Sequence, residues 1–191
     1  NAVILFHLAH HEGTFDGNGH VIIGLKNNAS KYYKQVNGTH QNVVVFPGMF
    51  STVKGTIKNV FVLDADFRGK QHTPKFKHHG IIADTLATSG KIFNCGAAGR
   101  ITCNNDPNYA DPEHDSELVF GGLVGLNEGL IYNCMAMAEL TGYTIGGMGG
   151  ENKGALKNGF TNGVYNYLHN GITGKYAGGI AATNTCTIDN C

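Results

Sequence analysis

The chain has 191 residues, of which 41% are hydrophobic, so it is long enough to bury the core of one domain. Its 14 basic and 14 acidic residues leave no formal net charge, which argues against a polyanionic partner such as a nucleic acid. No apolar run approaches the roughly 20 residues of a membrane-spanning helix, so we expect no membrane span.

Glycine is unusually frequent, with 28 residues against 4 prolines. This balance is typical of short strands joined by tight turns, and no Gly-x-y period indicates collagen. The chain begins with Asn1 rather than Met, and the next residues lack the basic region of a signal peptide. We therefore expect a piece of a longer chain, with a single domain over residues 1–191.

The first quarter of the chain predicts strands and one polar insertion. Residues 1–11 contain a short apolar run that indicates an entry strand or a cap. Residues 13–25 hold two strand-like runs around Asp-Gly-Asn-Gly, which tolerates the positive φ of a tight turn. The polar residues at about 26–46 are expected to form an insertion.

Apolar alternation with period two resumes at residue 48 and continues to residue 67. We expect a second insertion at about 68–79, which is basic, and a third at about 104–118, which is acidic. Around them the same order of elements recurs, most completely in residues 121–134, Gly-Gly-Leu-Val-Gly-Leu-Asn-Glu-Gly-Leu-Ile-Tyr-Asn-Cys. Further copies occupy residues 146–159 and 178–191.

The copies can be aligned on an element that consists of a small residue, any residue, an apolar residue, any residue and asparagine. This alignment places in register Asn59, Asn94, Asn133, Asn158 and Asn190. Successive asparagines of this set are 35, 39, 25 and 32 residues apart along the chain. A repeat in the twenties with regular glycines and no helical period predicts a β-solenoid, in which coils stack at about 4.8 Å. The fold class is therefore all-β, a parallel β-helix with inserted loops.

Stacking in register predicts three columns of like residues. The first is an inward aliphatic ladder of Ile57, Ile92, Ile131, Leu156 and Ile188. The second is the asparagine column, whose amides can hydrogen-bond from coil to coil. The third contains Cys95, Cys134 and Cys191, for which stacked free thiols are favoured over a disulfide. Five cysteines without a Cys-x-x-Cys pair also argue against a zinc ribbon.

Two stretches resemble a known family. They are Gly122-Leu123-Val124-Gly125, followed by Asn127-x-Gly129-x-Ile131-x-Asn133-Cys134, and residues 13–22. Both are similar to the GLUG-motif repeats of bacterial surface and secreted proteins, which include adhesin-like proteins and the repeat region of immunoglobulin A peptidases. The resemblance covers most of residues 13–191 outside the insertions, although the copies near residues 80 and 179 lack the last glycine.

The GLUG resemblance implies a right-handed parallel β-helix on an exported bacterial protein, secreted or at the cell surface. Such repeats serve as spacers and presentation scaffolds, so the first hypothesis is a non-catalytic adhesin-like stalk or a surface that binds carbohydrate or another host ligand. A spacer region of a secreted peptidase is a further alternative. Partners would be a host glycan or surface protein, and further coils or a second chain at the open ends.

A carbohydrate-active enzyme, either a polysaccharide lyase or a glycoside hydrolase, is the other alternative. Asp64 and Asp66 lie two apart on one predicted strand, as a carboxylate pair for acid and base catalysis would. Convergence with Asp84 in a groove would support this hypothesis. We favour a solvated strand face and assign no catalytic residue, because no third group is fixed beside the pair.

The insertions are the expected place for binding, because long loops on a rigid scaffold usually carry it. Candidate ligand-binding residues are Tyr32, Tyr33, Lys75 and Lys77. Oxygen ligands for Ca²⁺ could come from Asp106, Asp111, Glu113 and Asp115, although the regular spacing of a calcium loop is missing. We otherwise expect no cofactor, and we interpret His7, His10, His11, His78 and His79 as structural rather than metal-binding.

Overall fold

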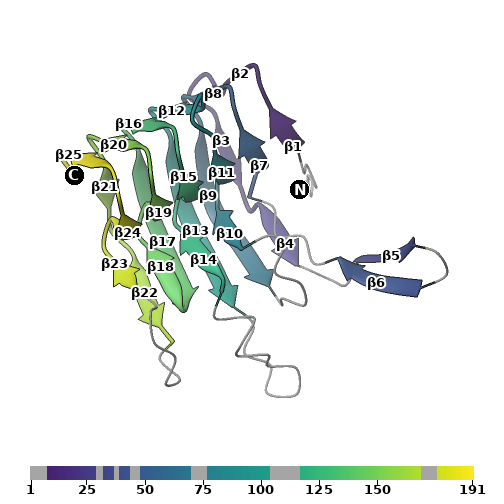
Figure 1. The fold of residues 1–191 in the computed structure, drawn as a ribbon. Coiled ribbons are helices and arrows are strands. Elements are labelled where there is room, and N and C mark those ends of the chain that lie inside the picture. The colour runs from purple at the N-terminus through teal and green to yellow at the C-terminus, as the bar shows by residue number, and fades with distance from the viewer. Residues whose placement is uncertain are drawn as a thin grey trace.

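The computed structural model of the protein describes residues 8–28, 32–36, 39–43, 48–69, 77–103, 117–168 and 176–191. Within these ranges the chain forms 25 strands and no helix (Figure 1). The prediction of an all-β fold is therefore confirmed for the described part of the chain. None of these residues forms a helix that is long and apolar enough to span a bilayer.

Sheets A and B each contain six strands, and each strand of sheet A is followed along the chain by a strand of sheet B. Sheet A is formed, in spatial order, by β1 (Leu8–His11), β7 (Phe50–Val53), β11 (Ala83–Leu86), β15 (Val124–Asn127), β19 (Gly149–Asn152) and β24 (Ala181–Asn184). Sheet B is formed by β2 (Thr14–Asp16), β8 (Thr56–Lys58), β12 (Lys91–Phe93), β16 (Leu130–Tyr132), β20 (Ala155–Lys157) and β25 (Thr187–Asp189).

Sheets C and E complete the stack. Sheet C contains β3 (Val21–Ile23), β4 (Lys26–Asn28), β9 (Phe61–Gly69), β13 (Gly96–Cys103), β17 (Met135–Gly142), β21 (Phe160–Thr161) and β22 (Val164–Tyr167). Sheet E contains β10 (His78–Gly80), β14 (Val119–Gly121), β18 (Thr144–Gly146) and β23 (Ala177–Gly178). The remaining sheet, D, is an antiparallel hairpin of β5 (Tyr32–Val36) and β6 (Thr39–Val43).

One full coil visits sheets E, A, B and C in that order, as β14 to β17 do before β18 returns to sheet E. Strands of successive coils pair in parallel, and β14 pairs with β18 in the register Val119 to Thr144. The shift of 25 residues equals the shortest spacing of the asparagine column. This arrangement is a β-solenoid, and Figure 1 shows the two ends of the chain at opposite ends of the stack.

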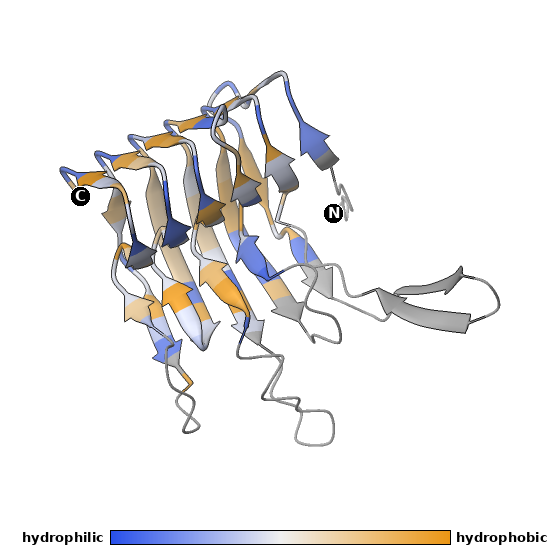
Figure 2. Cartoon of the chain, viewed as in Figure 1, coloured by the Kyte–Doolittle hydropathy of each residue, from blue (hydrophilic) through white to orange (hydrophobic). Residues whose placement is uncertain are grey.

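The core runs along the axis as columns of equivalent residues. Phe15, Ile57, Ile92, Ile131, Leu156 and Ile188 are in register in sheet B, which confirms the predicted aliphatic ladder and adds a phenylalanine at its start. Ile57, Ile92, Ile131 and Leu156 are fully buried. Each such side chain contributes about 1.5–3 kcal/mol through burial. Figure 2 shows apolar positions recurring from coil to coil.

Ile188, the last member of this ladder, is 37% exposed. No described strand pairs with β25 on its far side, whereas β20 covers its near side. The C-terminal end of the described stack therefore presents free strand edges and an apolar surface.

The glycines of the repeated motif allow coils to approach at the corner between sheets E and A. A Cβ atom on Gly122 would collide with the backbone carbonyl of Gly147, and one on Gly147 would collide with the carbonyl of Gly179. Only glycine lets the backbones of successive coils pack this closely. The glycine pattern is therefore a packing requirement and not a phosphate-binding loop.

The stack extends beyond the boundaries that we expected for the insertions. Residues 26–28 form β4, which pairs in parallel with β9, and His78 and His79 belong to β10. Leu118 is also buried in the core. A polar strand such as β4 cannot be predicted from alternating apolar residues, because it is formed through backbone hydrogen bonds to a neighbouring coil.

Candidate functional site

The asparagine column occupies the corner that follows sheet B. Asn59, Asn94, Asn133, Asn158 and Asn190 all have φ between 51° and 53°, the left-handed conformation. Asparagine is one of the few residues that adopt this conformation readily, since its short amide can bond locally. The turn therefore favours asparagine at the corner independently of any hydrogen bond between coils.

The side-chain amides of this column also bond from coil to coil. Asn133 donates to Asn94 Oδ1 at 2.7 Å, Asn94 donates to Asn59 Oδ1 at 3.3 Å, and Asn190 donates to Asn158 Oδ1 at 2.9 Å. All donors point toward the N-terminal coil. The amides thus form a polar ridge along the corner between sheets B and C, which we call the asparagine ridge.

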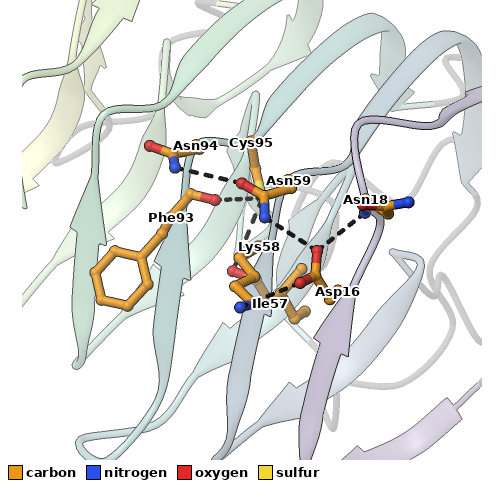
Figure 3. A network of polar contacts seen from close by, with 8 residues as sticks. All are labelled: Asp16, Asn18, Ile57, Lys58, Asn59, Phe93, Asn94 and Cys95. Carbon is orange, nitrogen blue, oxygen red and sulfur yellow. Dashed lines mark hydrogen bonds and ion pairs between the residues drawn. The ribbon is translucent and has the colours of Figure 1, made fainter.

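Asp16 closes the N-terminal end of the ridge, as Figure 3 shows. Its carboxylate accepts hydrogen bonds from Asn59 Nδ2 at 3.0 Å and from the backbone N–H of Asn18 at 2.9 Å, and Lys58 Nζ lies 3.1 Å away. These contacts, led by the Asn59 hydrogen bond, lower the pKa of Asp16 from 3.8 to about 2. A carboxylate has no proton to donate, so the chain of donors ends here.

One rung of the ridge is missing. Among the described residues no hydrogen bond joins Asn158 to Asn133, although their strands pair in register. The oxygen of Asn133 and the amino group of Asn158 are therefore an acceptor and a donor that face solvent without a protein partner.

An aromatic pair lies beside the ridge on the outer face of sheet B. Phe93 and Tyr132 immediately precede Asn94 and Asn133, and their ring centroids are 6.3 Å apart in an edge-to-face arrangement. Tyr132 is 41% exposed. Lys91 and Lys157 flank the pair, and neither makes an ion pair with another described residue. Two aromatic rings and two lysine side chains thus lie on the outer surface of sheet B beside the amides of the ridge, and we call this surface the aromatic face.

A pocket of about 280 Å³ lies on the other side of the ridge, toward sheet C. It is lined by Phe61, Asn94, Cys95, Asn133, Cys134, Met135, Asn158 and Phe160. Gly96 occupies the register position between Phe61 and Met135, and a Cβ atom there would lie within 3.0 Å of both side chains. The pocket is therefore small, largely apolar, and bordered by the amides of the ridge.

Cys95 and Cys134 form part of the pocket lining and belong to adjacent coils. The backbone N–H of Cys95 donates to Cys134 Sγ at 3.4 Å, and the thiols donate to the carbonyls of Phe93 at 3.1 Å and Tyr132 at 3.2 Å. Both cysteines are buried and free of disulfides. The neighbouring Cys95 thiol and burial raise the pKa of the Cys134 thiol. Cys191 ends the column as an exposed thiol beyond Gly159.

A second asparagine column was not expected from the sequence. Asn127, Asn152 and Asn184 end successive strands of sheet A, and their amides bond at 2.6 Å and 2.7 Å in the direction of the C-terminus. The first two are fully or almost fully buried. Leu86 and Val53 occupy the same register position in the preceding coils, so the column changes from apolar to polar along the stack. The signal was the Asn-x-Gly or Asn-x-Cys spacing in the last three copies.

The candidate catalytic carboxylates do not converge. Asp64 and Asp66 lie on β9 in sheet C, while Asp84 lies on β11 in sheet A and is almost completely buried. Asp66 accepts from Arg100 Nε at 3.3 Å, and Asp64 has a φ of 52° at the irregularity where β9 and β13 shift register. The groove of three carboxylates that the enzyme hypothesis requires is not present.

Asp66 belongs instead to a ladder of alternating charge on sheet C. Lys26, Asp66, Arg100 and Glu139 are paired in register on four successive coils. Opposite charges on directly paired residues stabilise a sheet modestly and disfavour a slipped register. We therefore interpret Asp66 as a structural residue.

Asp84 makes a buried contact with His79 that sequence reasoning missed. The Nδ1 atom of His79 lies 3.5 Å from Asp84 Oδ1, which also accepts from the backbone N–H of Gly48 at 2.9 Å. Burial raises the pKa of Asp84 and lowers the pKa of the neighbouring His78 to about 4. Within the described ranges no group of three or more His, Cys, Asp or Glu side chains is placed to hold a metal ion.

The remaining candidates lie on or near the insertions. Tyr32 and Tyr33 are on β5 of the hairpin, and Lys77 is an exposed residue directly before β10. Lys75 and the proposed calcium ligands Asp106, Asp111, Glu113 and Asp115 lie outside the described residues.

Comparison of the chain with family models, with curated proteins and with solved structures finds no significant match. The resemblance to GLUG repeats therefore depends on the motif residues alone.

Proposed function

We propose that this chain is a non-catalytic β-solenoid segment of an exported bacterial surface or secreted protein. It serves as a rigid, adhesin-like stalk, and its lateral surface binds carbohydrate. The observation that carries the proposal is the aromatic face beside the asparagine ridge, on a scaffold whose coils repeat at about 4.8 Å. The GLUG-like motif residues support the bacterial and exported origin.

The chemistry of this surface suits a sugar chain. A pyranose ring has an apolar face of C–H groups that stacks on an aromatic ring, while its hydroxyl groups exchange hydrogen bonds with amides. Tyr132 provides an exposed ring, and Asn133 directly follows it with an unpaired oxygen. Phe93 and Tyr132 lie on adjacent coils, with Lys58 and Lys157 at the same register position in the coils on either side, so a linear glycan could lie along the axis and contact several coils.

The finer features of the fold are part of the same proposal. A right-handed coil agrees with the strong preference for right-handed connections between parallel strands. The insertions would provide a separate place for binding through Tyr32, Tyr33, Lys75 and Lys77, and the acidic insertion would hold Ca²⁺. The exposed edges of β23, β24 and β25 would receive a further coil or another chain.

A glycan array probed with the intact chain tests the binding function. We expect selective binding to one class of glycan, which is lost in Tyr132→Thr. Met137→Thr is the matched control, since Met137 is 40% exposed on sheet C, away from the aromatic face. Absence of any glycan binding, or equal binding by the two variants, would contradict the carbohydrate proposal.

A further inference from the structure

The floor of the pocket beside the asparagine ridge combines soft sulfur donors in a way that the proposed function does not use. Cys95 and Cys134 are in adjacent coils and line the same pocket as Met135. Two free thiols of adjacent coils thus lie close to one another in the solenoid.

We propose that Cys95 and Cys134 form a binding site for one Cu(I) ion, held between their two sulfurs. Thiolate and thioether ligands select Cu(I) over the harder divalent ions. Zn²⁺ is a poorer fit, because it takes four ligands and no cluster of three His, Cys, Asp or Glu occurs in the described ranges.

The coil repeat matches the geometry of a two-coordinate ion. Paired parallel strands lie about 4.8 Å apart. Two metal–sulfur bonds of about 2.3 Å, the length of a zinc–thiolate bond, on opposite sides of an ion would separate the sulfurs by about 4.6 Å. Two cysteines in register on adjacent coils therefore accommodate the ion between them with little movement of the backbone. Cys191 has no such neighbour, since Gly159 occupies the intervening coil.

The surroundings suit a bound soft cation. Cys95 and Cys134 are 1% and 4% exposed and belong to the hydrophobic core, so an ion held between their sulfurs would be shielded from water. The backbone N–H of Cys95 already donates to Cys134 Sγ and would stabilise the thiolate. Binding replaces the two thiol protons by one Cu⁺ and releases two H⁺, without any change of oxidation state, so affinity rises with pH.

An anaerobic titration of the intact chain with Cu(I), in competition with a chromogenic Cu(I) chelator, tests the site. We expect one tightly held ion per chain. The double variant Cys95→Val, Cys134→Val should lose it. Valine is the appropriate replacement, since Val60 is buried in the same column one coil earlier and makes the equivalent backbone contact. Circular dichroism and the melting temperature verify that the variant folds.

The matched control removes the other cysteines and leaves only the proposed pair. The triple variant Cys103→Ser, Cys186→Ser, Cys191→Ser should retain the tight ion. Loss of the ion in this variant, or its retention in the double valine variant, would overturn the proposal, as would failure of the unmodified chain to bind Cu(I).

X-ray absorption at the copper edge provides a second readout that needs no variant. We expect only sulfur neighbours around the ion, and coordination by nitrogen or oxygen alone would refute the site.

Discussion

Replacing Asn152 by leucine should destabilise the protein because it removes hydrogen bonds from the buried core. Asn152 is 1% exposed. Its Nδ2 donates to Asn184 Oδ1 at 2.7 Å and to the carbonyls of Gly154 at 3.1 Å and Thr187 at 3.2 Å, while its Oδ1 accepts from Asn127 at 2.6 Å. Leucine has a similar size and already occupies the equivalent position at Leu86.

The expected cost follows from these four bonds. At a net contribution of about 0.5–1.5 kcal/mol each, their sum lies between about 2 and 6 kcal/mol. Because three of them share one amino group, we expect a loss near the lower half of that range, about 3 kcal/mol. For a chain of this length such a loss lowers the melting temperature by about 6–12 °C.

Urea unfolding followed by far-ultraviolet circular dichroism measures this free energy. Asn127→Leu and the double variant Asn127→Leu, Asn152→Leu complete a cycle. We expect the double variant to lose less than the sum of the single variants by at least about 0.5 kcal/mol, since it removes both partners of one bond. A change below about 0.5 kcal/mol in Asn152→Leu, or strict additivity, would refute the reasoning.

Three further predictions concern packing, charge and thiol access. Gly147→Ala should prevent stable folding, which a thermal melt would detect. Gly179→Ala should be tolerated, because a Cβ atom there meets nothing within 4 Å. Equal melting temperatures of the two variants would contradict the close-packing argument. Because the pKa of Asp16 is lowered, its carboxylate stabilises the folded protein fully above about pH 4, and this contribution is lost as the pH falls through about 2. Asp16→Asn should therefore reduce the loss of unfolding free energy between about pH 4 and about pH 2. An unchanged pH dependence in that range would disprove this. In the native protein a thiol reagent should modify Cys186 and Cys191 quickly but Cys95 and Cys134 only after unfolding, and rapid modification of all four would argue against burial.

The repeat itself was accessible from the sequence. Each coil requires an aliphatic residue facing inward and a residue in the left-handed conformation at the corner, and these demands recur at the same motif position. Aligning Ile131 and Asn133 with their equivalents therefore predicted the register that sheet B displays. The aromatic pair carried a signal too, because Phe93 and Tyr132 each directly precede an aligned asparagine.

Other features depended on contacts that no local pattern encodes. The polar strand β4 joins sheet C through backbone hydrogen bonds to β9, so its side chains gave no indication. The buried contact between His79 and Asp84 arises where sheets E and A meet. The pocket is lined by side chains of several coils, and stacking brings Phe61, Met135 and Phe160 into one row on sheet C.

The sequence by itself determined the class of fold, because a repeated unit with unsatisfied edges can only be completed by stacking on its own copies. Only the tertiary structure decided which side chains share a surface. Phe93 and Tyr132 are 39 residues apart along the chain but adjacent across the stack. Segments of unequal length between the coils change the number of residues that separate two equivalent positions, but they do not change the distance between paired strands. The side chains that share a surface therefore depend on which coils pair.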